Sequence, residues 1–206
     1  DHVDALAHNP KRLASCGRCY AETDVRVVDG EDRDIQPGEV GEIIVRGDDI
    51  MKGYWNAPEL TAEAIVKGYY RTGDLATVDE EGYIYIVDRK KEMIISGGFN
   101  IYPAEIEQVL YAHPDIYEAA AVGIPDEEWG EQIKAVVVLK PGHSATAQHI
   151  LDFCAQGLPG FKRPRSVDFT QELPKNPNGK IVRRLVREGL LAMTEGQLQT
   201  GKKTRD

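Results

Sequence analysis

The first 88 residues alternate short apolar runs with turn-forming residues, and this pattern restricts the structures that they can form. Val, Ile and Tyr concentrate in three runs, at residues 25–28, 43–45 and 83–87. Asp-Gly, Pro-Gly and Glu-Gly pairs, which favour tight turns, stand between these runs. Residues 59–66 differ, because Pro58 precedes apolar residues at helical spacing. We therefore expect residues 1–88 to form a β-rich, barrel-like antiparallel subdomain with one inserted helix.

A different pattern follows Asp88, where predicted strands alternate with predicted helices. Three strands are expected, at residues 116–124, 133–139 and 166–169. Three helices are expected to begin at Pro103, after Ser144 as an N-cap, and at Ile181. A small hairpin should turn at Gly97 and Gly98. Because the connections leave no room for long crossovers, we expect a compact α+β domain in which this hairpin and a three-stranded sheet are flanked by helices.

The charged segment at residues 88–92, which reads DRKKE, separates the two patterns. A polar linker that few contacts cross is where domains usually divide. The sequence therefore predicts one domain at residues 1–88 and a second at residues 89–192, followed by a polar tail at residues 193–206.

The acidic composition and the lack of long apolar runs argue against several classes of protein. The 206 residues carry a formal net charge of -9 and a pI near 5.1, whereas broad nucleic-acid binding needs a clustered basic face. Basic clusters at residues 162–165 and 183–184 suit only a small anionic ligand. No apolar run approaches the length of a membrane span, and residues 1–4 do not resemble a signal peptide. A cytoplasmic protein is the expectation.

Cys16, Cys19 and Cys154 do not form a recognisable metal or redox motif. A structural zinc needs four ligands, and no second CxxC follows the first. A redox CxxC should open a helix after a strand, whereas Tyr20 leads into a strand pattern. We expect reduced thiols and no metal site.

Two segments combine polar residues with glycine in a way that suits nucleotide binding. Residues 70–74 read YRTGD, and a carboxylate at a strand-to-turn junction can accept hydrogen bonds from both hydroxyls of a ribose. Residues 88–92 are followed by SGGFN at residues 96–100, where glycine would let the backbone approach a ligand closely. Taken alone, the first segment also fits a turn that Asp74 stabilises, and the second fits a solvated charge run with a hairpin turn.

A third segment, at residues 173–181, reads LPKNPNGKI and holds a lysine in a rigid loop before a helix. A cation at Lys180 could neutralise charge that develops on a phosphate. The segment is not a P-loop, because the GxxxxGK[ST] spacing is absent and Ile181 replaces the metal-binding hydroxyl. Alone, it also fits a surface lysine on a turn.

In combination, these segments resemble the adenylate-forming superfamily of acyl- and aryl-CoA synthetases, luciferases and peptide-synthetase adenylation domains. The resemblance runs from about Ser15 to about Leu190. It rests on GEI at 41–43, GYW at 53–55, RTGD at 71–74, DRKK at 88–91, GFNIYPAEIE at 98–107 and PNGKI at 177–181. The order and spacing of these motifs also agree with the superfamily.

The resemblance implies a two-step reaction. A carboxylic acid and ATP give an acyl-adenylate and pyrophosphate, and CoA then displaces AMP to give a thioester. By position, it implies that Asp74 and Arg89 bind ATP or AMP and that Lys180 serves adenylation. It also implies that Lys91 is the hinge of a mobile C-terminal lid.

The same resemblance indicates CoA as the acceptor. It implies that Gly97 and Gly98 bind this cofactor, in the hairpin that borders the pantetheine tunnel. The YPA tripeptide before Glu105 is similar to acyl-CoA synthetases rather than to peptide-synthetase domains. Asn100 stands where some members have a basic residue for a CoA phosphate, and composition offers three replacements, namely Lys162, Arg163 and Arg165.

The resemblance also implies what these residues lack. The phosphate loop, the Thr-Glu motif for Mg²⁺ and the acyl pocket of the superfamily precede the region that is matched. We therefore expect a C-terminal fragment of an ATP-dependent acyl-CoA ligase that is inactive alone and binds Mg²⁺ through a missing N-terminal domain. Two alternatives stay open, an adenylation domain that loads a carrier-protein thiol and a non-catalytic, lid-like binding module.

Overall fold

The computed structural model describes residues 10–19 and 22–202, with side chains as far as Met193. The chain divides into two compact units, Asp1–Lys91 and Glu92–Asp206. The division falls inside the charged segment that separates the two sequence patterns. Each unit is described by itself.

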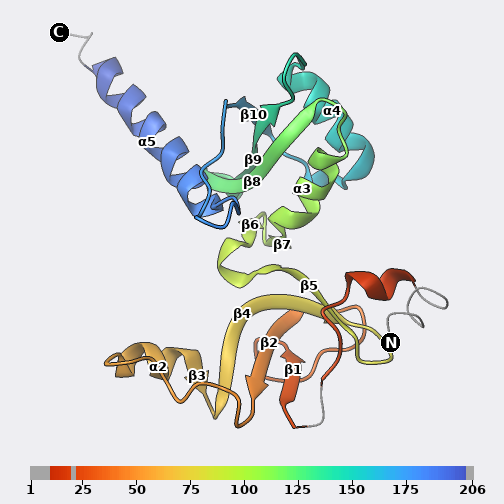
Figure 1. Cartoon of the computed structure of the whole chain (residues 1–206). Helices are drawn as coiled ribbons and strands as arrows, with labels where there is room; N and C mark the ends of the chain where they lie inside the picture. Colours follow the sequence, from red (N-terminus) through yellow and green to blue (C-terminus); the bar gives the residue numbers. More distant parts are fainter. Residues whose placement is uncertain (1–9, 20–21, 203–206) are drawn as a thin grey trace. The chain divides into compact units, whose positions relative to one another are not determined.

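Unit 1 is built on one antiparallel sheet that curls along its length (Figure 1). Its elements are η1 (Pro10–Ala14), β1 (Asp24–Val28), β2 (Gly41–Arg46), α2 (Pro58–Ala64), β3 (Ile65–Val66), β4 (Tyr69–Val78) and β5 (Ile84–Arg89). The strand order is β1-β2-β4-β3, and β5 also pairs with β4. The long β4 therefore has β3 beside its start and β5 beside its end. This sheet confirms the expected β-rich subdomain with one inserted helix.

Unit 2 is a mixed sheet covered by helices (Figure 1). After η2 (Lys90–Glu92) come β6 (Ile94–Ser96), β7 (Phe99–Ile101), α3 (Pro103–Tyr111), β8 (Ile116–Asp126), β9 (Gly130–Leu139), α4 (Ala147–Gly157), η3 (Gly160–Lys162), β10 (Ser166–Phe169) and α5 (Arg183–Lys202). β10 runs parallel to β9, and β8 runs antiparallel to it. These three strands are the expected three-stranded sheet. The β6–β7 hairpin extends it to five strands through the pair Ser96–Gly130.

Alternation along β8 explains why both faces of this sheet are covered. Ala119 and Ala121 pack in the cluster that contains Ile106 of α3 and Ile150 of α4. Ala120 and Val122 point to the opposite face and pack with Leu173 and with Val186 of α5. Successive side chains of a strand face opposite sides of its sheet, so one Ala- and Val-rich strand serves two apolar layers.

Two helix boundaries differ from the sequence prediction. The N-cap of α4 is Thr146, whose side chain accepts the backbone N–H of His149 at 3.2 Å, so the prediction of Ser144 was wrong. Either hydroxyl could cap a helix, and only the backbone path decides between them. The last helix, α5, begins at Arg183 and its backbone continues to Lys202, beyond Leu190 where the apolar periodicity ends.

Candidate nucleotide and lysine sites

The turn at residues 72–74 in β4 is organised by Thr72 rather than by the neighbouring carboxylate. The Thr72 hydroxyl donates to the Ile43 carbonyl at 2.8 Å and accepts the Asp74 backbone N–H at 3.0 Å. Gly73 adopts φ +72, a conformation that glycine enters without steric cost. The Asp74 carboxylate therefore does not hold its own turn.

Asp74 instead pairs with the other residue that the sequence links to a nucleotide. Arg89 Nε lies 2.6 Å from Asp74 Oδ1, and the two residues are register partners on β4 and β5. Their side chains are 26% and 48% exposed, so neither group is closed off from a ligand. Unit 1 thus brings Asp74 and Arg89 together at one edge of the β4–β5 pair.

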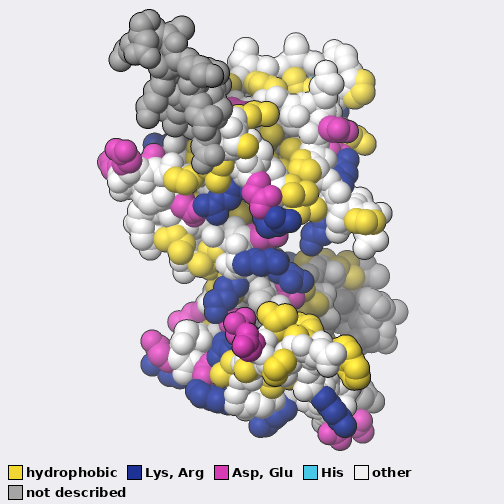
Figure 2. Space-filling view, turned by 90° about the vertical axis from the view of Figure 1, so that its left-hand side faces the viewer, with side chains coloured by type: hydrophobic (Ala, Val, Ile, Leu, Met, Phe, Trp, Pro, Cys, Tyr) yellow, Lys and Arg dark blue, Asp and Glu magenta, His cyan; other side chains and the backbone are white. Residues whose placement is uncertain are grey.

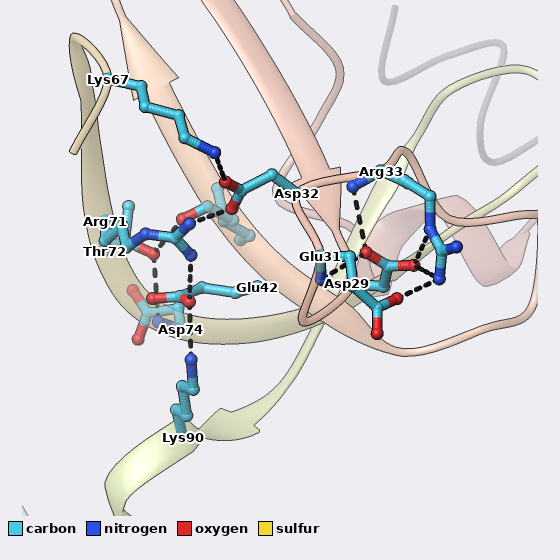
Figure 3. Close-up of polar contacts among 11 residues, drawn as sticks. Asp29, Glu31, Asp32, Arg33, Glu42, Lys67, Arg71, Thr72, Asp74 and Lys90 are labelled. Carbon is cyan, nitrogen blue, oxygen red and sulfur yellow. Dashed lines mark hydrogen bonds and ion pairs between the residues drawn. The ribbon is translucent and has the colours of Figure 1, made fainter.

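An ion network around the buried Glu42 lies close to Asp74 (Figure 3). Glu42 of β2 is only 6% exposed, and its Oε2 accepts from Arg71 Nη1 at 3.0 Å and from Lys90 Nζ at 2.9 Å. Arg71 also contacts Asp32, which accepts from Lys67 Nζ at 2.6 Å. The hydrogen bonds from Lys67 and Arg71 lower the pKa of Asp32. The sequence match includes Glu42, but nothing local in the sequence indicates its two partners.

The loop that carries Lys180 is fastened by one asparagine. Asn176 Oδ1 accepts the backbone N–H groups of Asn178 at 3.0 Å and of Lys180 at 2.9 Å. The Asn176 N–H donates to the Lys180 carbonyl at 2.9 Å, and Gly179 turns the chain at φ +79. The Asn-Pro-Asn-Gly segment is therefore a closed turn that fixes the Lys180 backbone.

The Lys180 side chain is exposed, and it lines a cavity of about 450 Å³ in unit 2. Three carboxylates and two further cations line the same cavity: Glu92, Glu107, Glu118, Lys175 and Arg183. Lys175 contacts Glu118, and Arg183 contacts both Glu92 and Glu107. Within residues 10–19 and 22–193, the Lys180 ammonium forms neither an ion pair nor a hydrogen bond.

The two hairpin glycines have different surroundings. The Gly97 N–H donates to the Trp129 carbonyl at 2.9 Å, and a Cβ on Gly97 would lie 2.7 Å from the Trp129 ring. Gly98 adopts φ +81, and a Cβ there would meet nothing within 4 Å. Gly97 is thus required by packing inside unit 2, whereas Gly98 faces open space.

A second cavity of about 230 Å³ lies beside this hairpin and is lined by rings and arginines. Phe99 and Phe161 pack with ring centroids 4.8 Å apart, and the Arg165 guanidinium lies 5.7 Å from the centre of the Trp129 ring. Arg163 also lines the cavity. Of the three basic residues that composition suggested, Lys162 is instead held by Glu105, at 2.6 and 2.9 Å.

The expected hinge residue, Lys91, is the last residue of unit 1 and is exposed in η2. It lies between Lys90, which Glu42 binds inside unit 1, and Glu92, which Arg183 binds inside unit 2.

One group of side chains has the composition of a metal site but the wrong hydrogen bonding. His113, Asp115 and His149 each offer a ligand atom within 4.8 Å of the others. His113 Nδ1 accepts the Asp115 backbone N–H at 3.2 Å, so the neutral ring carries its proton on the buried Nε2. Burial also lowers the pKa of His113. Neither ring nitrogen then offers a free lone pair, and we assign no ion to this group.

Two family models match the chain. The model described as AMP-binding enzyme matches residues 3–55, and the model described as AMP-binding enzyme C-terminal domain matches residues 105–180. These two regions belong to the AMP-binding enzyme family. Two of the six motifs that carry the sequence resemblance, those at residues 41–43 and 53–55, lie within the first match, and most of a third lies within the second.

Known members of the AMP-binding family resemble this chain over most of its length. Feruloyl-CoA synthase from Amycolatopsis sp is 46% identical over 181 residues, which are 88% of this chain and 37% of that relative. A long-chain-fatty-acid–CoA ligase from Escherichia coli O157:H7 is 46% identical over 174 residues, or 84% of this chain and 31% of that relative. The crystal structure of ATP-bound MatB from Rhodopseudomonas palustris has a TM-score of 0.81 and 36% identity, covering 85% of this chain and 35% of that one. The chain thus spans about a third of the length of these relatives.

The candidate residues lie in separate places. Asp74 and Arg89 form a pair in unit 1, whereas Lys180 lines one cavity of unit 2 and the hairpin glycines lie between Ser96 and Phe99, which line another. Figure 2 shows Lys and Arg side chains beside Asp and Glu side chains on the visible face of each unit. Among the residues that the structure describes, no helix is both long and apolar enough to cross a membrane.

Proposed function

We propose that this chain is the C-terminal part of an AMP-forming acid–thiol ligase. The complete polypeptide would convert a carboxylic acid and ATP into an acyl-adenylate and pyrophosphate, and would then transfer the acyl group to CoA with release of AMP. In this proposal, residues 1–88 complete the large adenylation domain and residues 89–192 form the mobile lid. The two named relatives act on different acyl groups, so we specify only the class of carboxylic acid.

The availability of the Lys180 charge carries this proposal. Its backbone is fixed by Asn176, and its ammonium projects into a cavity without a protein partner in the described residues. A preorganised cation can stabilise charge that develops on the α-phosphate during attack by the carboxylate, and it needs no rearrangement at that moment. Lys175, on the same loop, is held by Glu118 and does not have this freedom.

The nucleotide would be held by the Asp74–Arg89 pair. A carboxylate has lone pairs for both ribose hydroxyls even while one oxygen accepts from Arg89. The guanidinium keeps further donors for an oxygen of the nucleotide. The similarity to the ATP-bound structure of MatB supports this role.

The cavity beside Gly98 favours CoA over a carrier-protein thiol as the acceptor. Rings at Phe99, Phe161 and Trp129 could stack against a purine, and Arg163 and Arg165 could pair with phosphates. A carrier protein presents a pantetheine arm without the adenine nucleotide, so it would leave these groups unused. We therefore propose that this cavity takes the nucleotide end of CoA and that Gly97 and Gly98 border the pantetheine arm.

Magnesium has no assigned ligands in these residues. Asp32, Glu42 and Asp74 are each already paired with Lys or Arg side chains, which is unfavourable for binding a second cation. In our proposal Mg²⁺ is held by residues that precede this chain in the complete polypeptide, and no step described for the present residues passes through it.

The complete polypeptide would test this function in two assays. Pyrophosphate exchange that depends on a carboxylic acid reports adenylation, and thioester formation from CoA reports transfer; a hydroxycinnamic and a long-chain fatty acid cover the two named classes. We expect both activities with at least one acid. Exchange with transfer to a carrier thiol but not to CoA would support the carrier alternative. Neither activity, with nucleotide binding retained, would indicate a non-catalytic binding module.

A further inference from the structure

Arg183, the first residue of α5, makes the densest set of ion contacts near the Lys180 loop. Its Nε lies 2.7 Å from Glu107 Oε1 and its Nη2 lies 2.5 Å from Glu107 Oε2, which is a two-pronged pair with α3. Its Nη1 contacts Glu92, the first residue of unit 2. Two-pronged arginine–carboxylate pairs fix both distance and orientation.

This cluster is largely withdrawn from solvent. The side chains of Arg183, Glu107 and Glu92 are 17%, 13% and 28% exposed. Glu107 Oε1 also accepts the Ala121 backbone N–H of β8 at 3.0 Å. Arg183 therefore joins η2, α3, β8 and α5, whose residues are far apart in the sequence. Removing one partner of a buried ion pair costs more free energy than removing one partner of an exposed pair, because it leaves a buried charge uncompensated.

The cluster is continuous with the Lys180 loop. The Val182 N–H donates to the Pro174 carbonyl at 2.9 Å, and Lys175 and Ile181 form a β-bridge that closes the loop at its base. Lys180 thus lies between the turn held by Asn176 and the anchor made by Arg183. The same cavity is lined by Lys180, Arg183, Glu92 and Glu107.

Each carboxylate in this cavity is paired with a cation. Lys175 forms an ion pair with Glu118, and Arg183 forms ion pairs with Glu92 and Glu107. Without the guanidinium, two carboxylates that share a cavity with Lys180 would lose their partner and would attract another cation. Of the two lysines that line this cavity, Lys175 is already paired with Glu118, so we expect the Lys180 ammonium to be attracted.

We propose that Arg183 is a positioning residue that anchors the Lys180 loop and occupies Glu107 and Glu92, so that the Lys180 ammonium stays available for the adenylation step. This inference rests on the proposed function. Arg183 itself touches neither ATP nor the acid in this scheme, and its effect passes entirely through Lys180.

The main test uses the complete polypeptide and compares the two half-reactions. Arg183→Ala should lower acid-dependent pyrophosphate exchange about ten- to a hundredfold, as expected when a catalytic group is misplaced. Turnover of supplied acyl-adenylate with CoA should stay within about twofold, because Lys180 does not act in that step. The matched control is Arg184→Ala, which removes the next arginine and should leave both rates unchanged. The Arg184 side chain is exposed, and Glu188 is its one ion-pair partner among the side chains that the structure describes.

Two double variants separate positioning from a general structural role. Adding Glu107→Gln to Arg183→Ala should recover part of the exchange rate, because it removes one of the two carboxylates that could capture Lys180. Adding Arg183→Ala to Lys180→Ala should cause little further loss, because residues that act as one unit are not additive. Multiplied losses in the second pair, or no recovery in the first, would overturn the inference.

A measurement on the present chain covers the case in which Arg183→Ala does not fold. Arg183→Lys keeps the charge but cannot make two parallel bonds, and it should speed amide hydrogen exchange at Asn178 and Lys180 about tenfold. Arg184→Lys should not. If both variants leave these amides unchanged, Arg183 does not hold the loop.

If Lys180→Ala itself leaves pyrophosphate exchange intact, the proposed function fails first. If only Lys180→Ala lowers exchange, the proposed function survives and the role of Arg183 does not.

Discussion

Asp74 and Arg89 are bonded to each other, at 2.6 Å across β4 and β5. The pair holds the carboxylate in one orientation while both side chains remain partly exposed. Ordering a side chain on binding costs free energy, so a carboxylate that is already oriented binds more favourably than a mobile one. In the proposed function, unit 1 therefore supplies a prepared acceptor for a nucleotide ribose.

Asp74→Asn should weaken ATP binding in the complete polypeptide. The amide keeps the size of the side chain but loses the charge that strengthens its hydrogen bonds, a loss of about 1.5–3 kcal/mol or roughly ten- to a hundredfold in the KM for ATP. Steady-state kinetics of adenylation would measure it. The control is Asp34→Asn, which also breaks a carboxylate–arginine pair in unit 1 but at an exposed position. Equal effects of the two substitutions would rule out a nucleotide role for Asp74.

Lys180→Ala should impair adenylation far more than acyl transfer. Removing one preorganised charge-stabilising group typically lowers a rate by about a hundred- to a thousandfold. Supplying acyl-adenylate and CoA bypasses the affected step, so that rate should stay near wild type. Arg184→Ala is the matched control, because it removes a nearby exposed cation whose partner, Glu188, does not line the cavity of Lys180. A variant equally slow in both half-reactions would show that the role of Lys180 is misassigned.

The 206-residue chain alone should fold but form no acyl-CoA. Units 1 and 2 have separate buried clusters, one around Ile43 and Ala76 and the other around Ile106 and Leu110, so each can fold on its own apolar core. In the proposed function, the acid binds to residues that precede this chain in the complete polypeptide. Circular dichroism would establish folding, and thioester assays with ATP, CoA and a panel of acids would test activity. Thioester production clearly above background would refute the assignment of this chain as a part of the catalytic unit.

The sequence predicted features that depend on local pattern. Alternating or β-branched runs placed the strands, and Ser166–Phe169 was predicted to the residue. Pro103 marked the start of α3, because proline fits the first turn of a helix, where its missing N–H costs nothing. Motif order then located Asp74, Arg89 and Lys180 without any knowledge of their contacts.

The sequence could not predict pairs that only the fold brings together. Glu107 and Arg183 are 76 positions apart, and Glu42 and Lys90 are 48 apart, so no periodicity links them. A glutamate in a helix or strand pattern is expected on a solvated face, and burial of Glu42 follows only from the two cations that reach it. The difference between Gly97 and Gly98 likewise depends on where Trp129 packs.

Stability at high pH should depend on Cys154. This thiol is fully buried in unit 2, and burial raises its pKa from an ordinary value of 9.0 to about 11. The folded state therefore holds the proton more tightly than the unfolded state, and the resulting stabilisation, complete below a pH of about 9, is lost as the pH rises to about 11.

Urea unfolding across that pH range would detect the effect. Cys154→Ala should flatten the fall in the free energy of unfolding, whereas Cys16→Ala, which removes an exposed thiol, should keep the wild-type dependence. An unchanged slope in Cys154→Ala would mean that other groups govern alkaline unfolding.

Gly98→Leu in the complete polypeptide should spare adenylation and block transfer to CoA. A Cβ at Gly98 meets no atom of this chain within 4 Å, so the added side chain projects into the open space where we place the pantetheine arm. In adenylation Lys180 acts instead of the hairpin, and the leucine should then cause no interference. Acid-dependent pyrophosphate exchange and CoA-dependent turnover of purified acyl-adenylate would be measured side by side.

Backbone strain is the main competing explanation for a defect at Gly98, because its φ of +81 is unfavourable for leucine. Gly142 provides the matched control, since it has φ +78 and equally open surroundings but lies away from the hairpin, in the turn between β9 and α4. Gly142→Leu should carry the same strain and leave both half-reactions intact. Gly97→Leu should instead destabilise unit 2, because its Cβ would collide with Trp129. If Gly98→Leu lowers both half-reactions together, or if Gly142→Leu reproduces its loss of transfer, Gly98 is only a turn residue and the pantetheine arm passes elsewhere.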